Sequence, residues 1–211
     1  NESRFIMLNN AIDAAAYTYD PAKRADVRQA LGLGDELVVG HVGRFNQPKN
    51  HPFLLEIFAA LLKKEPNAVL LLVGGGEDMP KMQAKAKTLG IAEHVRFLGV
   101  CSDVAELMQA MDVFVFPSLY EGLPVTMVEA QAASLPCIIS DKVPPECILT
   151  DGLVDIIPLS SAPDAWAERV LEKRDFSRTD RRAEIAAHGF DINTEAVKLQ
   201  EFYLKAYEQN N

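Results

Sequence analysis

Two glutamates and the start of a helix are crowded into the segment SLYEGLPVTMVEA at residues 118–130. The apolar run DVFVFP precedes this segment and is typical of a buried strand. Pro124 suits the first position of a helix, where exposed backbone N–H groups form a binding site for an anion. Gly122 adds no side chain that would block such a site. The N–H groups that we expect to be free are those of Val125, Thr126 and Met127.

The carboxylates of Glu121 and Glu129 lie on either side of this helix start in the sequence. Because a phosphate would repel a carboxylate, Glu121 is better suited to accept hydrogen bonds from hydroxyl groups beside the anion, such as those of a sugar. Glu129 lies in the otherwise apolar segment MVEAQAASLP, where a carboxylate without a partner is costly. Glu129 therefore binds a ligand or, in the alternative, forms a salt bridge with a lysine or caps a helix.

The loop GRFNQPKN at residues 43–50 places two cations after another apolar run. Gly43 permits a sharp turn, and Arg44 and Lys49 would suit a pair of phosphates. The alternative is that both side chains are solvated, as charges on loops commonly are. The loop GGGED at residues 74–78 would let a ligand approach the main chain, although it is not GxGxxG and no P-loop lysine follows it.

The elements that must position these residues alternate along the chain. Short β-branched runs predict strands, and the amphipathic stretches between them predict helices. This alternation is typical of a Rossmann-like α/β fold, a parallel sheet with helices on both faces, in which the loops after the strands surround one cleft. The predicted strands lie at 36–42, 68–73, 94–99, 112–117, 137–140 and 153–159, and the predicted helices at 51–64, 79–90, 103–111 and from 124 onward.

The region after residue 160 changes to three helical patterns without a strand, at 161–173, 178–188 and 193–208. Ser161 is expected to cap the first of them, as Asp103 is expected to cap the earlier helix at 103–111. The last pattern has a large apolar face that either packs onto its own sheet or docks onto a further domain. This face consists of Leu199, Phe202, Tyr203 and Tyr207. We predict one domain over residues 1–211, with C-terminal helices at about 162–209.

The composition excludes several classes of function. The chain has 211 residues, of which 48% are hydrophobic, enough to bury a core. Its net charge of -9 provides no general attraction to nucleic acid or anionic lipid. The three cysteines include no CxxC pair, which predicts buried free thiols and a reducing cytoplasm. No apolar run is long enough to span a membrane, and residues 1–10 lack the features of a signal peptide.

A set of motifs occurs in a characteristic order: MLNNAID, GRFNQPKNH, LLLVGGGE, VRFLGV and DVFVFPSLYEGLPVTMVEAQAASLPCIISD. The most specific is EGLPVTMVE, in which seven residues separate two glutamates. In order and spacing these motifs resemble the nucleotide-sugar-binding half of family-four retaining glycosyltransferases, and the subtype resembles enzymes of capsule and exopolysaccharide biosynthesis. The resemblance runs from about Met7 to Asp141 and, more loosely, to the C-terminus.

The resemblance implies a role for each matching residue. Arg44 and Lys49 match the cations that hold the donor diphosphate and stabilise the departing nucleotide. Glu121 matches a glutamate that contacts the donor sugar, and Glu129 one that binds the ribose hydroxyls. The backbone near residue 99 corresponds to the loop that recognises the base. The other positions expected to contact the donor are Gly43, Gly75, Leu98, Gly99, Val100, Gly122, Leu123, Pro124 and Val125.

The resemblance also implies a GT-B architecture of two facing domains, of which this chain is the second. The acceptor-binding domain is expected before residue 1, and the lack of an initiator Met fits a fragment. The helix at 193–208 resembles the segment that crosses back onto that domain. No metal or cofactor is expected, because no Asp-x-Asp stands in a suitable loop. None of the four histidines matches a catalytic motif, so we expect surface or core positions for them.

We therefore expect a cytoplasmic domain that binds the donor, a nucleoside diphosphate sugar and most simply a UDP sugar. The complete enzyme would transfer the sugar to a glycan or lipid-linked acceptor with retention, in polysaccharide biosynthesis, and the missing domain would provide any contact with the inner face of the membrane. The chain alone is expected to bind donor weakly and to transfer nothing. Two alternatives are a nucleotide-sugar epimerase of the same architecture and a non-catalytic nucleotide-binding module, although the module has no use for both glutamates.

Overall fold

A computed structural model describes residues 5–208 of the 211-residue chain. A six-stranded sheet lies at its centre, and all neighbouring strands of the sheet are parallel. Every predicted strand is present, including the weak run near residue 155. The strands are β1 (Leu37–Val42), β2 (Ala68–Val73), β3 (Val95–Gly99), β4 (Val113–Phe116), β5 (Cys137–Ser140) and β6 (Val154–Ile157).

The strand order is β3-β2-β1-β4-β5-β6. The chain winds outward from β1 to β3, returns to the middle of the sheet, and then winds the other way from β4 to β6. The direction reverses between β1 and β4, where Val39 pairs with Val113 and Gly40 with Phe114. Doubly wound sheets bind ligands at such a reversal, beyond the carboxyl ends of the strands. The prediction of a Rossmann-like α/β fold is confirmed.

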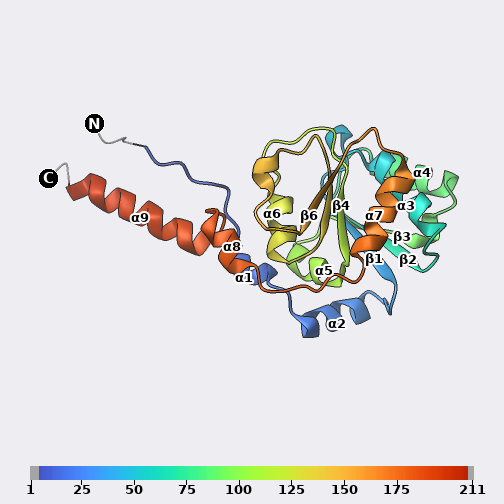
Figure 1. The fold of residues 1–211 in the computed structure, drawn as a ribbon, viewed down its shortest axis with the longest axis horizontal. Coiled ribbons are helices and arrows are strands. Elements are labelled where there is room, and N and C mark those ends of the chain that lie inside the picture. The colour runs from blue at the N-terminus through green and yellow to red at the C-terminus, as the bar shows by residue number, and fades with distance from the viewer. Residues whose placement is uncertain (1–4, 209–211) are drawn as a thin grey trace.

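Helices cover both faces of the sheet (Figure 1). The helices α3 (His51–Leu62), α4 (Met79–Thr88) and α7 (Pro163–Lys173) pack on one face, and α2 (Pro21–Ala30), α5 (Val104–Ala110) and α6 (Val125–Ala132) on the other. Along β1, Leu37 and Val39 point into the first core and Val38 into the second. Because both faces are covered, the strand must be apolar at successive positions. Short 3-10 turns lie at η1 (Gln47–Lys49), η2 (Ala92–His94) and η3 (Pro145–Cys147).

Helix caps differ from the sequence prediction in two places. Asp103 occupies the cap position of α5, but its side chain makes no capping hydrogen bond. The prediction for Ser161 is wrong, because the cap residue of α7 is Ala162, which has no side-chain acceptor. By contrast, Asp20 caps α2 by accepting hydrogen bonds from the first-turn N–H groups, and Pro21 follows it at the first helical position. This Asp-Pro pair is the sequence signal for α2, a helix that our sequence analysis did not assign.

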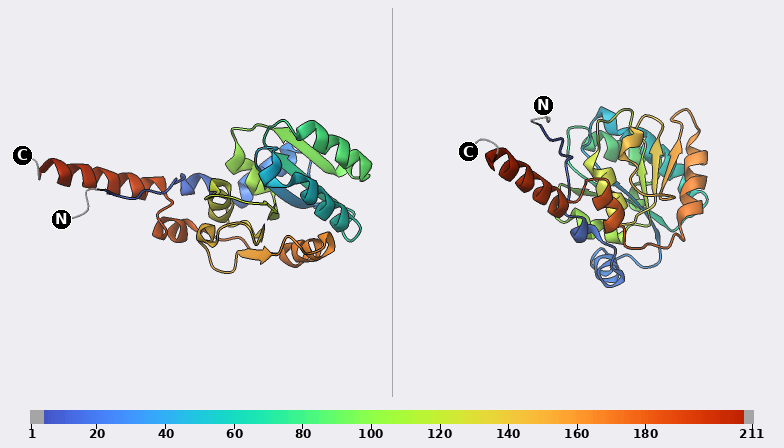
Figure 2. Two further views of the ribbon diagram at one scale, coloured as in Figure 1. Left: turned by 90° about the horizontal axis from the view of Figure 1, so that it is seen from above. Right: turned by 60° about the vertical axis from the view of Figure 1, so that its left-hand side comes forward.

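The C-terminal helices are α8 (Arg182–Ala187), shorter than predicted, and α9 (Ile192–Glu208). Helix α9 and the stretch before α1 (Ala14–Tyr17) project from one end of the α/β body (Figures 1 and 2). The alternative in which the last helix packs onto its own sheet is therefore wrong. Tyr203 of the predicted apolar face is 64% exposed, and the neighbouring Leu204 is 54% exposed, so α9 presents apolar side chains to solvent. The predicted helix end at residue 209 lies outside the described residues.

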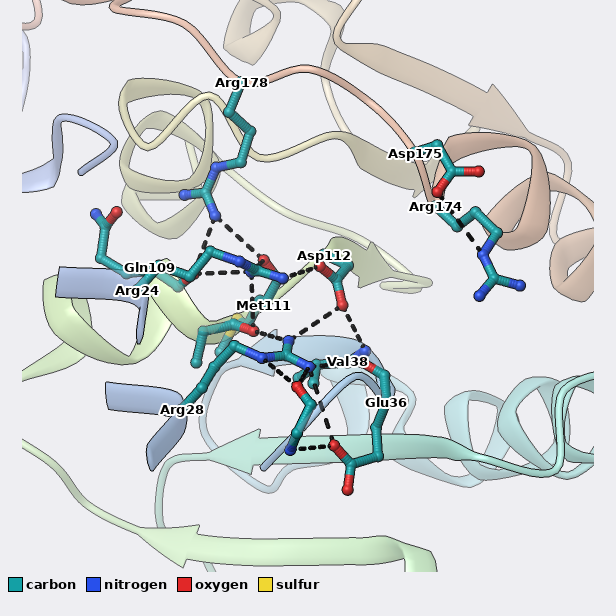
Figure 3. Close-up of polar contacts among 12 residues, drawn as sticks. Arg24, Arg28, Glu36, Val38, Gln109, Met111, Asp112, Arg174, Asp175 and Arg178 are labelled. Carbon is teal, nitrogen blue, oxygen red and sulfur yellow. Dashed lines mark hydrogen bonds and ion pairs between the residues drawn. The ribbon is translucent and has the colours of Figure 1, made fainter. Parts of the chain in front are cut away.

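Three arginines, Arg24, Arg28 and Arg178, contact the segment between α5 and β4 at the amino-terminal edge of the sheet (Figure 3). Arg24 of α2 pairs with Asp112 at 2.6 Å, and Arg28 approaches the same carboxylate at 3.4 Å. Arg178 follows α7 and lies over the ring of Tyr19, and burial lowers the pKa of this guanidinium to about 10. Cations at the end of a helix complement its dipole and satisfy its last acceptors. All three guanidinium groups donate to C=O groups at the end of α5, those of Gln109, Ala110 and Met111.

The three cysteines are free thiols. Cys137 and Cys147 are buried as predicted, and burial raises the pKa of Cys147 to about 11. Cys101 is only partly buried. Within residues 5–208, no helix is both long enough and apolar enough to cross a membrane.

Candidate functional site

The loop after β1 and the loop after β4 meet where the strand order reverses. The N–H group of Leu119 donates to the carbonyl of Pro48 at 2.8 Å. The side-chain amide of Asn50 donates to the carbonyl of Pro117 at 3.0 Å. These two hydrogen bonds hold together the loop that contains the predicted cations and the loop that contains the first predicted glutamate. Neighbouring parallel strands thus place the two loops at one edge of the sheet.

Lys49 and Glu121 form a salt bridge at the centre of this edge. Lys49 Nζ lies 2.7 Å from Glu121 Oε1, and the two side chains are only 16% and 11% exposed. The same Nζ lies 4.7 Å from the centroid of the Phe116 ring. Our sequence analysis did not expect this pair, since it assigned Lys49 to phosphate and Glu121 to sugar hydroxyls. In this arrangement a phosphate would compete with Glu121 for the ammonium group.

This competition leads to a prediction for Glu121→Gln. The variant removes a negative charge beside the expected phosphate position and releases Lys49, so we expect UDP to bind about threefold more tightly. Isothermal titration calorimetry on the 211-residue chain measures the change. Glu106→Gln on the exposed side of α5 is the matched control and should leave the affinity unaltered. Weaker binding by Glu121→Gln would show that the salt bridge positions Lys49 for the ligand instead of competing with it.

Arg44 lies at the edge of a pocket of about 520 Å³ formed by the loops after β1, β2 and β3. Its side chain is exposed and makes no hydrogen bond or ion pair within the described residues, so the alternative of a solvated charge remains. Gly75 and Val100, two predicted donor contacts, line the same pocket, and Leu98 and Gly99 end the adjacent strand. The remaining wall is largely apolar and suits a flat ring better than a charge. It includes Val42, Val73, Cys101 and Val104.

The glycines of the GGGED loop serve a purpose that our sequence analysis did not predict. A Cβ atom on Gly74 would lie 2.1 Å from the carbonyl oxygen of Gly43, and one on Gly76 would lie 2.4 Å from that of Phe45. Both glycines also have positive φ, 137° and 151°. They therefore permit close packing of the loop after β2 against the loop after β1. The same loop also lines the pocket of about 520 Å³, so our expectation that it admits a ligand to the main chain stays a prediction.

The start of α6 offers unpaired backbone donors. The helix begins at Val125, so Pro124 is its cap residue and not its first helical residue. The N–H of Met127 donates to the carbonyl of Pro124 at 2.9 Å, which corrects our expectation that it is free. Four N–H groups make no hydrogen bond within residues 5–208 and remain available to an acceptor. They belong to Gly122, Leu123, Val125 and Thr126.

Glu129, the second predicted glutamate, has a partner that our sequence analysis missed. The hydroxyl of Tyr17 donates to Glu129 Oε1 at 2.7 Å. Neither a lysine nor a capping interaction binds the carboxylate among the described residues, so neither alternative applies. Burial raises the pKa of Glu129, and the hydrogen bond from Tyr17 partly counteracts this effect. The two residues lie 112 positions apart, so no local pattern links them.

Two histidines lie beneath the loop after β1. His41 and His51 are buried, with ring centroids 4.7 Å apart, and His41 Nδ1 donates to the carbonyl of Val115 at 2.9 Å. Burial lowers the pKa of His51 to about 4 and that of His41 well below its usual range. Both rings are therefore neutral near pH 7 and act as core residues that support the loop. The expectation of core positions is confirmed for these two histidines.

The other chemical features of the described residues are less suited to a ligand. No group of three His, Cys, Asp or Glu side chains in residues 5–208 is arranged to hold a metal ion. A polar pocket of about 390 Å³ lies at the opposite edge of the sheet, beside Arg24, Arg28 and Asp112. The guanidinium groups of Arg24 and Arg28 are already engaged by Asp112 and by backbone carbonyls. The carboxyl edge therefore remains the candidate site.

Comparison with known proteins identifies the family to which the chain belongs. The family model described as "Glycosyl transferases group 1" matches residues 23–183, and the chain belongs to this glycosyltransferase family. The chain is 35% identical over 212 residues to the putative glycosyltransferase EpsF of Bacillus subtilis, covering 99% of this chain and 55% of EpsF. It is 28% identical to UDP-Gal:alpha-D-GlcNAc-diphosphoundecaprenol alpha-1,3-galactosyltransferase of Escherichia coli, covering 94% of this chain and 53% of that protein. The chain thus spans about half the length of these relatives.

Solved structures support the fold assignment. The crystal structure of Anabaena Alr3699/HepE in complex with UDP and glucose matches with a TM-score of 0.78 and 22% identity, covering 94% of this chain and 56% of that one. Sucrose-phosphate synthase from Thermosynechococcus elongatus matches with a TM-score of 0.79 and 23% identity, covering 97% of this chain and 53% of that one. The six-stranded parallel sheet is therefore the Rossmann-like fold found in GT-B glycosyltransferases.

Proposed function

We propose that this chain is the donor-binding half of a retaining glycosyltransferase of polysaccharide biosynthesis. The proposed donor is a nucleoside diphosphate sugar, most simply a UDP sugar, and the proposed acceptor is a glycan or a lipid-linked sugar. Three similarities support this proposal: the identity to EpsF, the UDP-Gal named for the Escherichia coli relative, and the UDP and glucose in the HepE structure. Relatives named as GDP-mannose-dependent also match, so experiments should include both UDP and GDP.

A single observation supports the proposal most strongly, namely the set of groups at the point where the strand order reverses. Lys49, Glu121 and the unpaired N–H groups at the start of α6 lie on loops after the adjacent strands β1 and β4. Cations and free N–H groups suit a diphosphate, whereas carboxylates suit hydroxyl groups. A nucleoside diphosphate sugar offers a diphosphate between two sets of hydroxyl groups, those of the ribose and those of the sugar.

In the proposed reaction the bond between the anomeric carbon and the diphosphate oxygen breaks, and an acceptor hydroxyl attacks from the same face. Negative charge accumulates on the departing diphosphate. Arg44, Lys49 and the free N–H groups would stabilise that charge, an effect usually worth about 3 kcal/mol for each donor. Glu121 would accept hydrogen bonds from the sugar and Glu129 from the ribose. No metal and no cofactor is part of this proposal.

The rest of the active site is proposed to come from sequence that the relatives have and this chain lacks. The chain spans about half of EpsF, and we propose that the other half binds the acceptor. The exposed apolar side chains of α9, among them Tyr203 and Leu204, would pack against that half. On this basis the isolated chain binds donor weakly and does not transfer sugar. Robust turnover by the 211-residue chain alone would contradict this part of the proposal.

The two alternatives to a glycosyltransferase, an epimerase and a non-catalytic nucleotide-binding module, predict different reactions with the donor. An epimerase would convert one nucleotide sugar into another, whereas a transferase consumes the donor only when an acceptor is present. The match to a glycosyltransferase family favours the transferase. Incubation of the complete protein with donor, with and without acceptor, followed by analysis of the sugar, separates the two. A non-catalytic nucleotide-binding module would have no use for both carboxylates, that of Glu121 on the loop before α6 and that of Glu129 on α6 itself.

Glu129→Ala provides the direct test of nucleotide binding. The variant removes the proposed acceptor for the ribose hydroxyls, so we expect the affinity for UDP to fall about tenfold, the usual effect of losing a hydrogen bond to a charged group. Calorimetry with UDP, GDP and their sugars measures the affinity and also identifies the base. Because the variant also removes the hydrogen bond from the Tyr17 hydroxyl, the free energy of unfolding should fall by about 1 kcal/mol. An unchanged affinity for UDP and GDP would favour the non-catalytic module.

A further inference from the structure

We propose that Tyr17 is a positioning residue for nucleotide binding, which holds one oxygen of Glu129 and leaves the other oxygen for the ribose. The hydroxyl of Tyr17 donates to Glu129 Oε1 at 2.7 Å, a short bond to a carboxylate. No other residue from 5 to 208 forms a hydrogen bond or ion pair with this carboxylate. The inference rests on the proposed function, in which Glu129 binds ribose hydroxyls.

Tyr17 is itself held firmly. Its carbonyl accepts a hydrogen bond from the side-chain amide of Gln109 at 3.1 Å, and Gln109 is only 1% exposed. The ring of Tyr17 packs against two apolar clusters, and Leu123 of the loop before α6 packs against the same two. The hydroxyl therefore projects from a fixed helix, α1, toward α6. A carboxylate fixed in this way loses less conformational freedom when it binds a ligand.

The hydroxyl group is not explained by packing. A phenylalanine ring would fill the same space, and Glu129 is the only hydrogen-bond partner of the Tyr17 hydroxyl among the described residues. Burial raises the pKa of Glu129, while the hydrogen bond from Tyr17 acts in the opposite direction and favours the ionised carboxylate. An ionised carboxylate is the stronger acceptor for ligand hydroxyls. Tyr17 thus both orients Glu129 and helps to keep it charged.

The experiment compares Tyr17→Phe with the wild-type chain, using UDP and 2′,3′-dideoxy-UDP as probes in calorimetry, and GDP and its dideoxy analogue in parallel. Tyr17→Phe should bind the ribonucleotide about tenfold more weakly. It should bind the dideoxynucleotide as the wild type does, because that probe offers no hydroxyl to Glu129. Tyr19→Phe is the matched control and should leave both affinities unchanged, since the ring of Tyr19 contacts Arg178 and the hydroxyl that binds Glu129 is that of Tyr17.

The outcomes distinguish a failure of the role proposed for Tyr17 from a failure of the role proposed for Glu129. If Tyr17→Phe weakens both probes equally, or neither, or if it fails to fold, the hydroxyl has a different or purely structural role and the inference is overturned. If the wild-type chain binds neither UDP nor GDP, or binds the ribo and dideoxy forms equally, the proposed role of Glu129 fails first. In the Glu129→Ala background, Tyr17→Phe should cause no further loss of UDP affinity, as expected for two residues that act as one unit.

Discussion

Arg44→Ala is expected to lower the affinity of the chain for UDP about thirtyfold while leaving its stability unchanged. The side chain makes no hydrogen bond or ion pair within residues 5–208 and is exposed, so its removal disturbs nothing in the fold. Its guanidinium group would form charge-assisted hydrogen bonds with the diphosphate, and losing these usually costs about 2 kcal/mol. Calorimetry with UDP measures the affinity, and thermal unfolding measures the stability.

Lys49→Ala should differ from Arg44→Ala in a diagnostic way. It should lose a similar amount of affinity, but it also leaves Glu121 partly buried without its salt bridge, at a cost of about 1 kcal/mol in stability. Lys63→Ala, at the opposite end of α3 from the site, is the matched control and should bind UDP normally. If Arg44→Ala binds UDP as well as the wild type, Arg44 is a solvated loop charge and the diphosphate lies elsewhere.

Gly74→Ala is expected to destabilise the fold by about 3 to 4 kcal/mol. The added Cβ would lie 2.1 Å from the carbonyl oxygen of Gly43, and φ at this position is 137°. Backbone strain of this kind costs about 1–3 kcal/mol, and forcing apart packed backbone costs a similar amount. Because the displaced segment begins the loop that contains Arg44 and Lys49, UDP affinity should fall as well. Chemical denaturation measures the free energy of unfolding.

Gly90→Ala separates the two causes of this effect. Gly90 also has positive φ, 71°, but a Cβ there would meet no atom within 4 Å. It should therefore cost only about 1 kcal/mol, the penalty for a non-glycine residue in this backbone conformation. If the two variants lose the same stability, the loops after β1 and β2 move apart easily and their close packing contributes little to the site.

The local pattern of the sequence is sufficient to predict the strands and most helices. The run AVLLLV is apolar at every position, which is expected only when both faces of a parallel strand are covered, and it forms β2 between β1 and β3. Pro124 and the residues after it mark the start of α6 within one position. The order of strand, loop and helix also predicts that the loops after β1 and β4 lie at one edge. These features depend on neighbours in the sequence and on the handedness of the chain.

Features that depend on contacts between distant residues could not be predicted. The pattern of loop 43–50 suggests a ligand for Lys49. In the structure the loop after β4 lies close enough for Glu121 to form a salt bridge with Lys49. Gly74 permits the close approach of a neighbouring loop, and α9 projects from the α/β body instead of lying on the sheet (Figure 1).

The sequence by itself therefore determined the class of fold, the edge of the sheet at which the candidate site lies and the kinds of residue gathered there. The tertiary structure decided which of these residues are partners, as with Tyr17 and Glu129, 112 residues apart. The physical reason is that strand and helix propensities act over a few residues. A hydrogen bond or salt bridge between loops, by contrast, depends on side-chain positions within about 3 Å, which only the packed sheet establishes.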